Sequence, residues 1–272
     1  MSLRKAALVT AGSAGLGAAI ARVLALNLGM SVTVNYAHDA GRAEALVREL
    51  RSGWQKSSHV SGKEGQPSVL PPSFTAIQAD LSDKSQVARL VREAAAAAGG
   101  RLDVVVSNVG WTRMRNFADL DDGVDEADWD RCFAVNVKSH LWLFHAARPW
   151  LEESNSREAG SAVFVSTASV AGVKPSGSSL PYAVTKAAQI HLIKSLATIA
   201  APTIRVNSVS PGVLLTDWGL SFPAERLDET KRRNALQRFA TVEDVAAQVK
   251  LYVTSKSVTG QNAVVDAGYT LS

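Results

Sequence analysis

Short apolar runs alternate with helix-length amphipathic segments along almost all of this 272-residue chain. The runs are nearly continuous in Val, Ile, Leu and Ala, which is typical of strands covered on both faces of a sheet. A strand followed by a helix, repeated many times, predicts a parallel sheet with right-handed crossovers. We therefore expect an α/β fold, a single Rossmann-type doubly wound domain whose seven-stranded parallel sheet is flanked by helices.

The expected elements follow from this alternation. Strands are predicted at residues 6–10, 31–36, 74–78, 102–107, 162–167, 204–209 and 263–265. Helices are predicted at residues 17–28, 40–50, 84–98, 127–150, 182–200 and 241–254. A single domain is expected to span residues 1–272.

Two segments interrupt the pattern. Residues 51–73 are rich in Ser, Gly and Pro and are longer than most loops of a compact domain, so we expect a surface insertion there. Residues 216–240 mix Trp218 and Phe222 with charged residues, which favours a substrate loop or lid, although a packed connection fits equally well.

Composition excludes several classes of protein. The chain is 46% hydrophobic and 20% charged, an ordinary globular balance, and its net charge of +4 is scattered rather than clustered, so nucleic-acid binding is not expected. No apolar run approaches the ~20 residues of a membrane span, so we expect a cytoplasmic protein. The single cysteine, Cys132, is expected to be a buried thiol, and the five histidines show no metal-binding spacing.

A glycine cluster follows the first predicted strand and opens the first predicted helix. The cluster reads Thr10-Ala11-Gly12-Ser13-Ala14-Gly15-Leu16-Gly17. Glycines allow the backbone to turn sharply and approach a phosphate, and a helix N-terminus directs free N–H groups at an anion. This segment therefore predicts a site for the phosphates of a dinucleotide.

Two side chains on one predicted helix face have the chemistry of a proton-transfer pair. Tyr182 and Lys186 are four residues apart, and an ammonium near a phenol is expected to lower its pKa from about 10. Ser169 lies thirteen residues before Tyr182, at the end of a predicted strand, where open α/β sheets place their ligands. A hydroxyl there can hold a substrate oxygen beside the phenol.

These residues resemble the catalytic set of the short-chain dehydrogenase/reductase family, in particular members like 3-oxoacyl reductases and polyketide ketoreductases. The glycine cluster is similar to the family's T-G-x-x-x-G-x-G loop, with Ala11 in place of its first glycine. The resemblance implies catalytic roles for Ser169, Tyr182 and Lys186, and a role for Asn136 in supporting a water that relays protons with Lys186.

The resemblance continues through motifs that follow the other predicted strands, and residues 51–73 are its main exception. It implies that Asp80 accepts from the adenine amino group and that Val213 and Thr216 hold the nicotinamide carboxamide. Near the C-terminus, Ala267 replaces a usual glycine. The implied cofactor-binding residues are Gly12, Ser13, Gly15, Leu16, Gly17, Asn35, Tyr36, Asp80, Leu81, Asn108, Val109, Gly110, Tyr182, Lys186, Pro211, Gly212, Val213 and Thr216.

The second predicted strand ends without a carboxylate. Asn35-Tyr36-Ala37-His38 occupies the place where an acid would bind ribose hydroxyls and repel a 2′-phosphate. The neutral stretch resembles members of the family that use NADP(H), although it lacks their usual arginine. We therefore expect NADP(H), with NAD(H) as the weaker alternative.

Taken together, the sequence predicts an NADP(H)-dependent oxidoreductase that moves a hydride between the nicotinamide and a carbonyl or secondary alcohol carbon. Trp111, Trp218 and Phe222 are candidates to line its substrate site. An NAD-dependent alcohol dehydrogenase, a non-redox enzyme and a dinucleotide sensor remain open as alternatives. The family resemblance also implies a homo-oligomer, either a homotetramer formed through the two long helices or a dimer.

Overall fold

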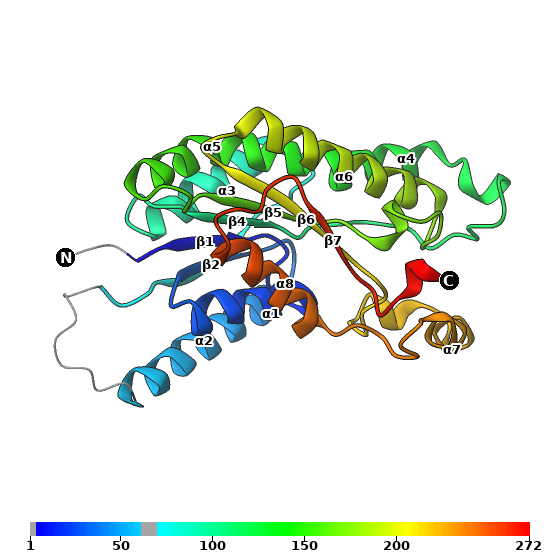
Figure 1. Ribbon diagram of the computed structural model, residues 1–272, viewed down its shortest axis with the longest axis horizontal. Helices are drawn as coiled ribbons and strands as arrows, with labels where there is room; N and C mark the ends of the chain where they lie inside the picture. Colours follow the sequence, from blue (N-terminus) through cyan, green and yellow to red (C-terminus); the bar gives the residue numbers. More distant parts are fainter. Residues whose placement is uncertain (1–3, 61–69) are drawn as a thin grey trace.

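The computed structural model describes residues 4–60 and 70–272. Its seven strands form one parallel sheet in the order β3-β2-β1-β4-β5-β6-β7, as predicted (Figure 1). The strands are β1 (Ala6–Val9), β2 (Ser31–Tyr36), β3 (Phe74–Gln78), β4 (Val104–Ser107), β5 (Val163–Thr167), β6 (Arg205–Pro211) and β7 (Asn262–Val265). All six strand pairings are parallel, which confirms the predicted α/β fold.

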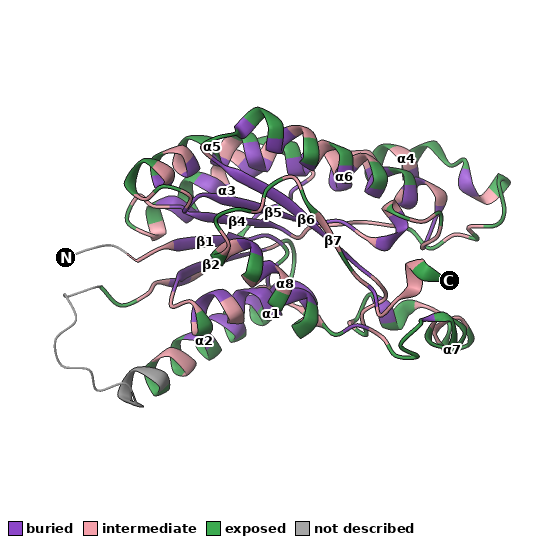
Figure 2. Ribbon diagram, in the orientation of Figure 1, coloured by how far each residue is buried: buried purple, intermediate pink, exposed green. Residues whose placement is uncertain are grey.

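Helices cover both faces of the sheet (Figure 1). They are α1 (Gly15–Arg22), α2 (Ala40–Val60), α3 (Lys84–Ala97), α4 (Glu126–Phe133), α5 (Ser139–Arg157), α6 (Leu180–Ala200), α7 (Ala224–Arg233) and α8 (Val242–Thr254). One core packs α1, α2 and α8 against the sheet, and a second core packs α3, α5 and α6 on the other face. Figure 2 shows the central strands buried and the outer helix faces exposed.

The order of the strands creates a crevice at the carboxyl edge of the sheet. The chain leaves β1 for β2 and β3 on one side, and then returns to β4 on the other side of β1. The loops after β1 and β4 therefore diverge, and ligands of open α/β folds bind at such a switch point. Among residues 4–60 and 70–272, no helix is both long and apolar enough to cross a bilayer.

The helix after β2 is longer than predicted. The sequence placed its end at Leu50, but α2 continues to Val60, so the first part of the predicted 51–73 insertion is helical. Trp54 anchors the extra turns, because it packs against the core of the α1 side and the Arg4 guanidinium lies 4.6 Å from its ring centroid. Residues 61–69, which complete most of the predicted insertion, lie outside the described residues.

The helix predicted at 127–150 is a composite. α4 and α5 are joined without a break by a π-helical turn, η3 (Ala134–Lys138), and α5 continues to Arg157. A π-helical turn holds one extra residue within a helix and is frequent at functional sites. Asn136, one of the predicted catalytic residues, lies in this turn and is fully buried.

The segment predicted as a loop or lid at 216–240 is partly helical. It contains a short 3-10 turn, η5 (Gly219–Ser221), and the helix α7. The sequence of α7, AERLDETKRR, is rich in helix-forming residues, and an ion pair of 3.8 Å joins Glu229 to Arg233 one turn later. None of its residues is fully buried, so the apolar periodicity that reveals a packed helix is missing.

Candidate active site

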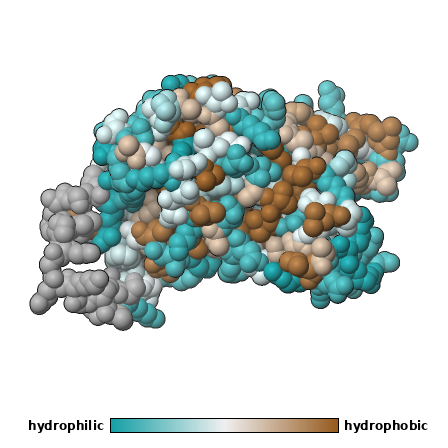
Figure 3. All heavy atoms as spheres, in the orientation of Figure 1, coloured by the Kyte–Doolittle hydropathy of each residue, from teal (hydrophilic) through white to brown (hydrophobic). Residues whose placement is uncertain are grey.

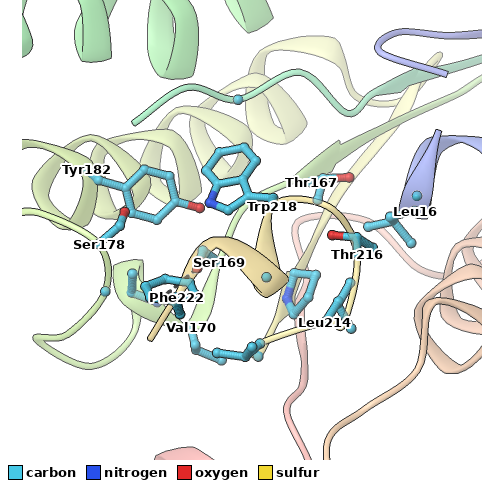
Figure 4. Close-up of a pocket in the computed structure, with 18 of the residues that line it drawn as sticks. Leu16, Thr167, Ser169, Val170, Ser178, Tyr182, Leu214, Thr216, Trp218 and Phe222 are labelled. Atoms are coloured by element: carbon cyan, nitrogen blue, oxygen red, sulfur yellow. Dashed lines mark hydrogen bonds between the residues drawn. The ribbon is translucent and has the colours of Figure 1, made fainter. Parts of the chain in front are cut away.

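A cavity of about 420 Å³ opens at the carboxyl ends of the central strands. Its walls come from the glycine loop after β1, the loop after β4, the ends of β5 and β6, and helices α6 and α7. Figure 4 shows Ser169, Tyr182, Trp218, Thr216 and Leu16 around this space. Part of the site predicted from the sequence, including Ser169 and Tyr182, therefore lies around one cavity.

The glycine loop is tightly folded. A side chain at position 12 would meet the Val9 carbonyl oxygen at 2.8 Å, and one at position 17 would meet the Ala11 carbonyl oxygen at 2.3 Å. Gly15 has a φ of +49°, a left-handed conformation that suits glycine. This close-packed turn leads directly into the N-terminus of α1, where free N–H groups favour an anion.

Asn35 fastens this loop to the sheet. Its side-chain oxygen accepts from the Ala11 N–H at 3.1 Å, and its amide nitrogen donates to the carbonyl oxygens of Tyr36 and Ala79 at 3.1 and 3.0 Å. Asn35 is 2% exposed and does not reach the cavity, so its observed role is to hold the loop. This position was predicted as a direct cofactor contact.

Thr10 and Asn108 join the two sides of the switch point. The Asn108 N–H donates to the Thr10 hydroxyl at 2.9 Å, and the Asn108 side-chain amide donates to the Ala11 carbonyl at 3.3 Å. The loop after β4 is thereby tied to the glycine loop after β1. Asn108 lines the cavity, as does Gly110 two residues later.

Ser169, Tyr182 and Lys186 come together at the end of β5 and the start of α6. Ser179 caps α6 by accepting from the Tyr182 N–H at 3.2 Å, which fixes where the helix begins and hence where the phenol lies. Of the four predicted catalytic residues, these three line the cavity, and Asn136 does not. The Lys186 ammonium lies 5.5 Å from the centroid of the Tyr182 ring.

Burial dominates the electrostatics of this cluster. Desolvation raises the pKa of Tyr182 to about 12, although the hydrogen bond from Ser169 works against this rise. Desolvation also lowers the pKa of Lys186 to about 7. The net pKa of the phenol is therefore raised and not lowered as the sequence predicted, because loss of water around the buried ring is the largest contribution. At neutral pH the phenol is a protonated group that can donate a proton.

Asn136 makes contacts within the protein. Its side-chain oxygen accepts from the Trp111 N–H at 2.7 Å, and its amide nitrogen donates to the Trp111 carbonyl at 2.9 Å and to the Thr185 hydroxyl at 3.1 Å. These bonds join the loop after β4 to α6. The predicted water relay between Asn136 and Lys186 stays a prediction, since the observed partners of this amide are protein groups.

The aromatic residues divide between two places. Trp218 and Phe222 line the cavity, whereas Trp111 lies behind it against Asn136 and Arg131. The Trp218 ring centroid is 5.9 Å from that of Tyr182, and the two rings are neighbours in Figure 4. A side chain at Gly110 would meet the Trp218 ring at 3.5 Å and the Lys186 ammonium at the same distance. Trp218 therefore forms the part of the cavity wall next to Tyr182 and Gly110.

The structure brings together most of the predicted cofactor-binding residues. Those that line the cavity are Gly15, Leu16, Asn108, Gly110, Tyr182, Lys186, Pro211, Gly212, Val213 and Thr216. Those outside its walls are Gly12, Ser13, Gly17, Asn35, Tyr36, Asp80, Leu81 and Val109. Asp80 is exposed, and its carboxylate accepts from the N–H and hydroxyl of Ser82.

The sequence did not reveal several residues of the site. Arg226 on α7 donates to the Gly177 carbonyl at 2.6 Å and borders the cavity, and Gln189 accepts from the Lys186 ammonium at 2.9 Å. Gln189 follows Lys186 by three residues on the same helix, so its proximity was readable from helical spacing. Neither Gln189 nor Arg226 belongs to a recognisable motif, so the sequence gave no reason to select them.

A parallel sheet with this glycine loop and a Ser–Tyr–Lys cluster at its carboxyl edge defines an oxidoreductase of the Rossmann type. A family model described as enoyl-(acyl carrier protein) reductase matches residues 10–270. The chain is 34% identical over 264 residues to a putative ketoacyl reductase 2 of the granaticin polyketide synthase of Streptomyces violaceoruber, covering 96% of this chain and 94% of that protein.

Further similarity extends over the same length. A 3-oxoacyl-[acyl-carrier-protein] reductase FabG of Staphylococcus aureus is 31% identical over 271 residues, covering 98% of this chain and 99% of that one. A short-chain dehydrogenase of Burkholderia cenocepacia, crystallised with NADP, superposes with a TM-score of 0.81 at 33% identity, covering 98% of each chain. The chain belongs to the short-chain dehydrogenase/reductase family.

Proposed function

We propose that this protein is an NADP(H)-dependent carbonyl reductase, which transfers a hydride between the nicotinamide and a carbonyl or secondary alcohol carbon. The observation that carries the proposal is the convergence of Ser169, Tyr182 and Lys186 on one cavity that also reaches the glycine loop. The family's members include oxidoreductases named for reducing ketoacyl groups, which fits a carbonyl substrate.

The residues of the crevice fit a dinucleotide. The backbone leaves no room for a side chain at position 12 or position 17. Gly15 is exposed and is the first residue of α1. Gly15, Leu16, Asn108, Val213 and Thr216 would hold the cofactor, with Tyr182 and Lys186 at its reactive end. When bound, the reduced nicotinamide supplies the hydride that the substrate carbon accepts.

The chain's own residues would handle the substrate oxygen. The Ser169 hydroxyl would donate a hydrogen bond to the carbonyl and orient it toward Tyr182. The Tyr182 phenol, protonated at neutral pH because its pKa is raised to about 12, would give its proton to that oxygen as the alcohol forms. The Lys186 ammonium, 5.5 Å from the centroid of the Tyr182 ring, would place positive charge near the phenolate and stabilise that anion as the proton leaves.

NADP(H) is favoured by the groups at the end of β2. Tyr36, Ala37 and His38 bring no carboxylate to this place. Asp39, the first acid after the strand, is held by Arg42, whose backbone N–H donates to its carboxylate at 2.8 Å and whose guanidinium lies 3.6 Å away. A similar structure from Burkholderia cenocepacia carries NADP, which supports the same choice.

We further propose that residues 1–272 act as one catalytic domain and that the segment from Thr216 to α7 forms the substrate side of the cavity. Trp218, Phe222, Arg226 and Leu227 contribute to its walls, which supports this placement. The substrate itself is a small molecule that carries a reducible carbonyl or an oxidisable alcohol.

The experiment that tests the function follows oxidation of NADPH and of NADH with purified protein. The panel contains ketones, 3-oxoacyl thioesters, quinones and polyketide-like phenols. We expect turnover with at least one carbonyl class and a higher kcat/KM with NADPH than with NADH. Higher kcat/KM with NADH would overturn the cofactor assignment, and substrate loss without cofactor oxidation would point to a non-redox reaction.

Replacing Tyr182 with Phe tests the proton donor. We expect Tyr182→Phe to lower kcat by about 100-fold or more, the usual contribution of a general acid, with an unchanged dissociation constant for NADPH measured by fluorescence titration. Ser178→Ala, which removes a different hydroxyl from the same wall, serves as the comparison and is expected to retain most turnover. Wild-type kcat in the Tyr182→Phe variant would contradict the assignment.

A further inference from the structure

A buried polar cluster lies directly behind the Lys186 ammonium. His140 from α5, Ser166 from β5 and Gln189 from α6 are each 0% exposed. Burying polar side chains destabilises a fold unless hydrogen bonds replace the lost water. The proposed chemistry uses none of the three, so their position against a functional lysine calls for a physical reason.

The hydrogen bonds of Gln189 allow only one orientation of its amide. Its amide nitrogen donates to the Ser166 hydroxyl at 2.7 Å and to the Thr167 carbonyl at 3.0 Å. A carbonyl oxygen can only accept, so the nitrogen must face β5 and the oxygen must face Lys186. The Lys186 ammonium donates to that oxygen at 2.9 Å.

His140 also contacts Ser166 and Gln189, and it adds no charge to the cluster. Its Nδ1 atom lies 3.0 Å from the Ser166 hydroxyl, which already accepts from Gln189 and can therefore donate to this nitrogen. Both ring nitrogens lie 3.2 to 3.3 Å from the Gln189 amide nitrogen. Burial lowers the pKa of His140 to about 3, so the ring is neutral, and it also interacts with the backbone of Val109 in the loop after β4.

Two fixed acceptors determine where the ammonium lies. Lys186 donates to the Thr167 carbonyl at 3.1 Å and to Gln189, and an ammonium carries three hydrogens, so one remains for the side of Tyr182. The other titratable groups that face Lys186 are Cys132 from α4, His140 from α5 and Tyr182. The pKa of Cys132 is raised to about 11, so these three neighbours are neutral at pH 7.

We propose that Gln189 is a positioning residue, whose amide oxygen, locked by Ser166 and His140, holds the Lys186 ammonium beside Tyr182. The proposal rests on the proposed function for its kinetic consequence only. Because the same cluster reaches β5 and the Val109 backbone, it also links the lysine to the segments that border the crevice.

The direct test is the titration of Lys186 by NMR in protein labelled with ¹³C at the lysine ε-carbons, with its signal assigned by loss in Lys186→Arg. In the wild type we expect a midpoint near pH 7. Gln189→Met removes an acceptor from the charged form and should lower the midpoint by about one pH unit. Gln189→Glu adds a negative charge and should raise it.

Kinetics provide the second readout. With a substrate of the proposed reaction, Gln189→Met should lower kcat by about tenfold with little change in the substrate KM, because an interaction that orients the reacting groups is lost. If protonated Lys186 is the working form, activity falls above its pKa. The high-pH limb of kcat should then move to lower pH in Gln189→Met and to higher pH in Gln189→Glu.

Asn207→Leu is the matched control, because Asn207 is another fully buried amide whose bonds, to Val258 and Gln261, lie on β6 away from Lys186. It should lose stability but keep the wild-type lysine titration.

If Gln189→Met does not fold, two other variants test the proposal. They are Gln189→Glu and Ser166→Ala, which removes the hydroxyl that accepts from the Gln189 amide. A Lys186 midpoint and a pH profile unchanged in the folded variants would overturn the proposal. The titration needs no substrate, so a failed proposed function would leave it interpretable.

Discussion

Two alanines occupy positions where the short-chain dehydrogenase/reductase family usually has glycine, and both adopt the conformation that glycine favours. Ala11 has a φ of +45° and Ala267 a φ of +55°. An L-residue is strained in this left-handed region because its Cβ approaches the backbone. The two turns therefore keep the shape that glycine favours, and the alanines that occupy them are strained.

The strain predicts that glycine stabilises the protein at these two positions. We expect Ala11→Gly and Ala267→Gly each to raise the free energy of unfolding by about 0.5 to 1 kcal/mol, a relief of strain partly offset by the entropy of glycine in the unfolded chain. Urea denaturation measures the change. Ala45→Gly, at an exposed position of α2, should instead lose about 1 kcal/mol; an equal loss at Ala11 would refute the strain argument.

At this scale the sequence identified residues better than it identified their energetics. The spacing of Ser169, Tyr182 and Lys186 was sufficient to predict that they lie together, and all three line one cavity. The pKa values were not predictable, because desolvation depends on how the rest of the chain covers the site. The role of Asn35 was missed for the same reason, since its partners come from three segments.

Among the elements, the segment between β6 and α7 supplies the part of the cavity wall that lies beside Tyr182. The Trp218 ring contacts both Tyr182 and Gly110, which are predicted to contact the cofactor. An ion pair of 2.8 Å between Asp217 and Arg42 of α2 holds the same segment across the crevice. In this arrangement the indole ring occupies space beside the phenol, and we expect it to move when a dinucleotide binds.

Removing the indole ring should therefore favour binding. An aromatic pair contributes about 0.5 to 1.5 kcal/mol, so we expect Trp218→Ala to lower the dissociation constant for NADPH by about two- to tenfold. Isothermal titration calorimetry measures the change. Leu220→Ala, an exposed position of the same segment, should bind NADPH like the wild type. Weaker binding by Trp218→Ala would show that the ring supports the cofactor.

The predictability of each element followed from how it is buried. The strands were placed to within about two residues because helices cover both faces of the sheet, and the central strands β1, β4 and β5 are fully buried runs rich in apolar residues. α7 was missed because it buries no residue completely. The π-helical turn was missed because one extra residue barely disturbs the apolar pattern of a long helix.

At the scale of the whole molecule, apolar side chains remain exposed on the long helices and on the last strand. Leu141 on α5 is 41% exposed, Ile199 on α6 is 67% exposed and Val264 on β7 is 38% exposed. Figure 3 shows apolar residues gathered along β7 on the face turned to the viewer. Grouped exposed apolar side chains are common at interfaces between subunits.

The predicted homotetramer through α5 and α6 can be tested on this surface. We expect light scattering after size exclusion to give four times the 28.8 kDa of one chain. Leu141→Glu places a charge on α5 and should reduce the mass, because burying an unpaired charge in an interface is unfavourable. Leu236→Glu, at a position between α7 and α8 that is 60% exposed, should leave the mass unchanged. A monomeric wild type would contradict the expectation.

The fastening of the glycine loop by Asn35 and Asn108 bears on how quickly a dinucleotide can associate. These amides, together with the Gly12 N–H that donates to the Asn35 carbonyl at 2.9 Å, hold the loop backbone in its final shape. The conformational entropy of this half of the crevice is therefore lost during folding and not upon association. In the proposed complex a diphosphate would meet a loop that is already folded, and we expect any slow rearrangement on binding to occur in the opposite wall.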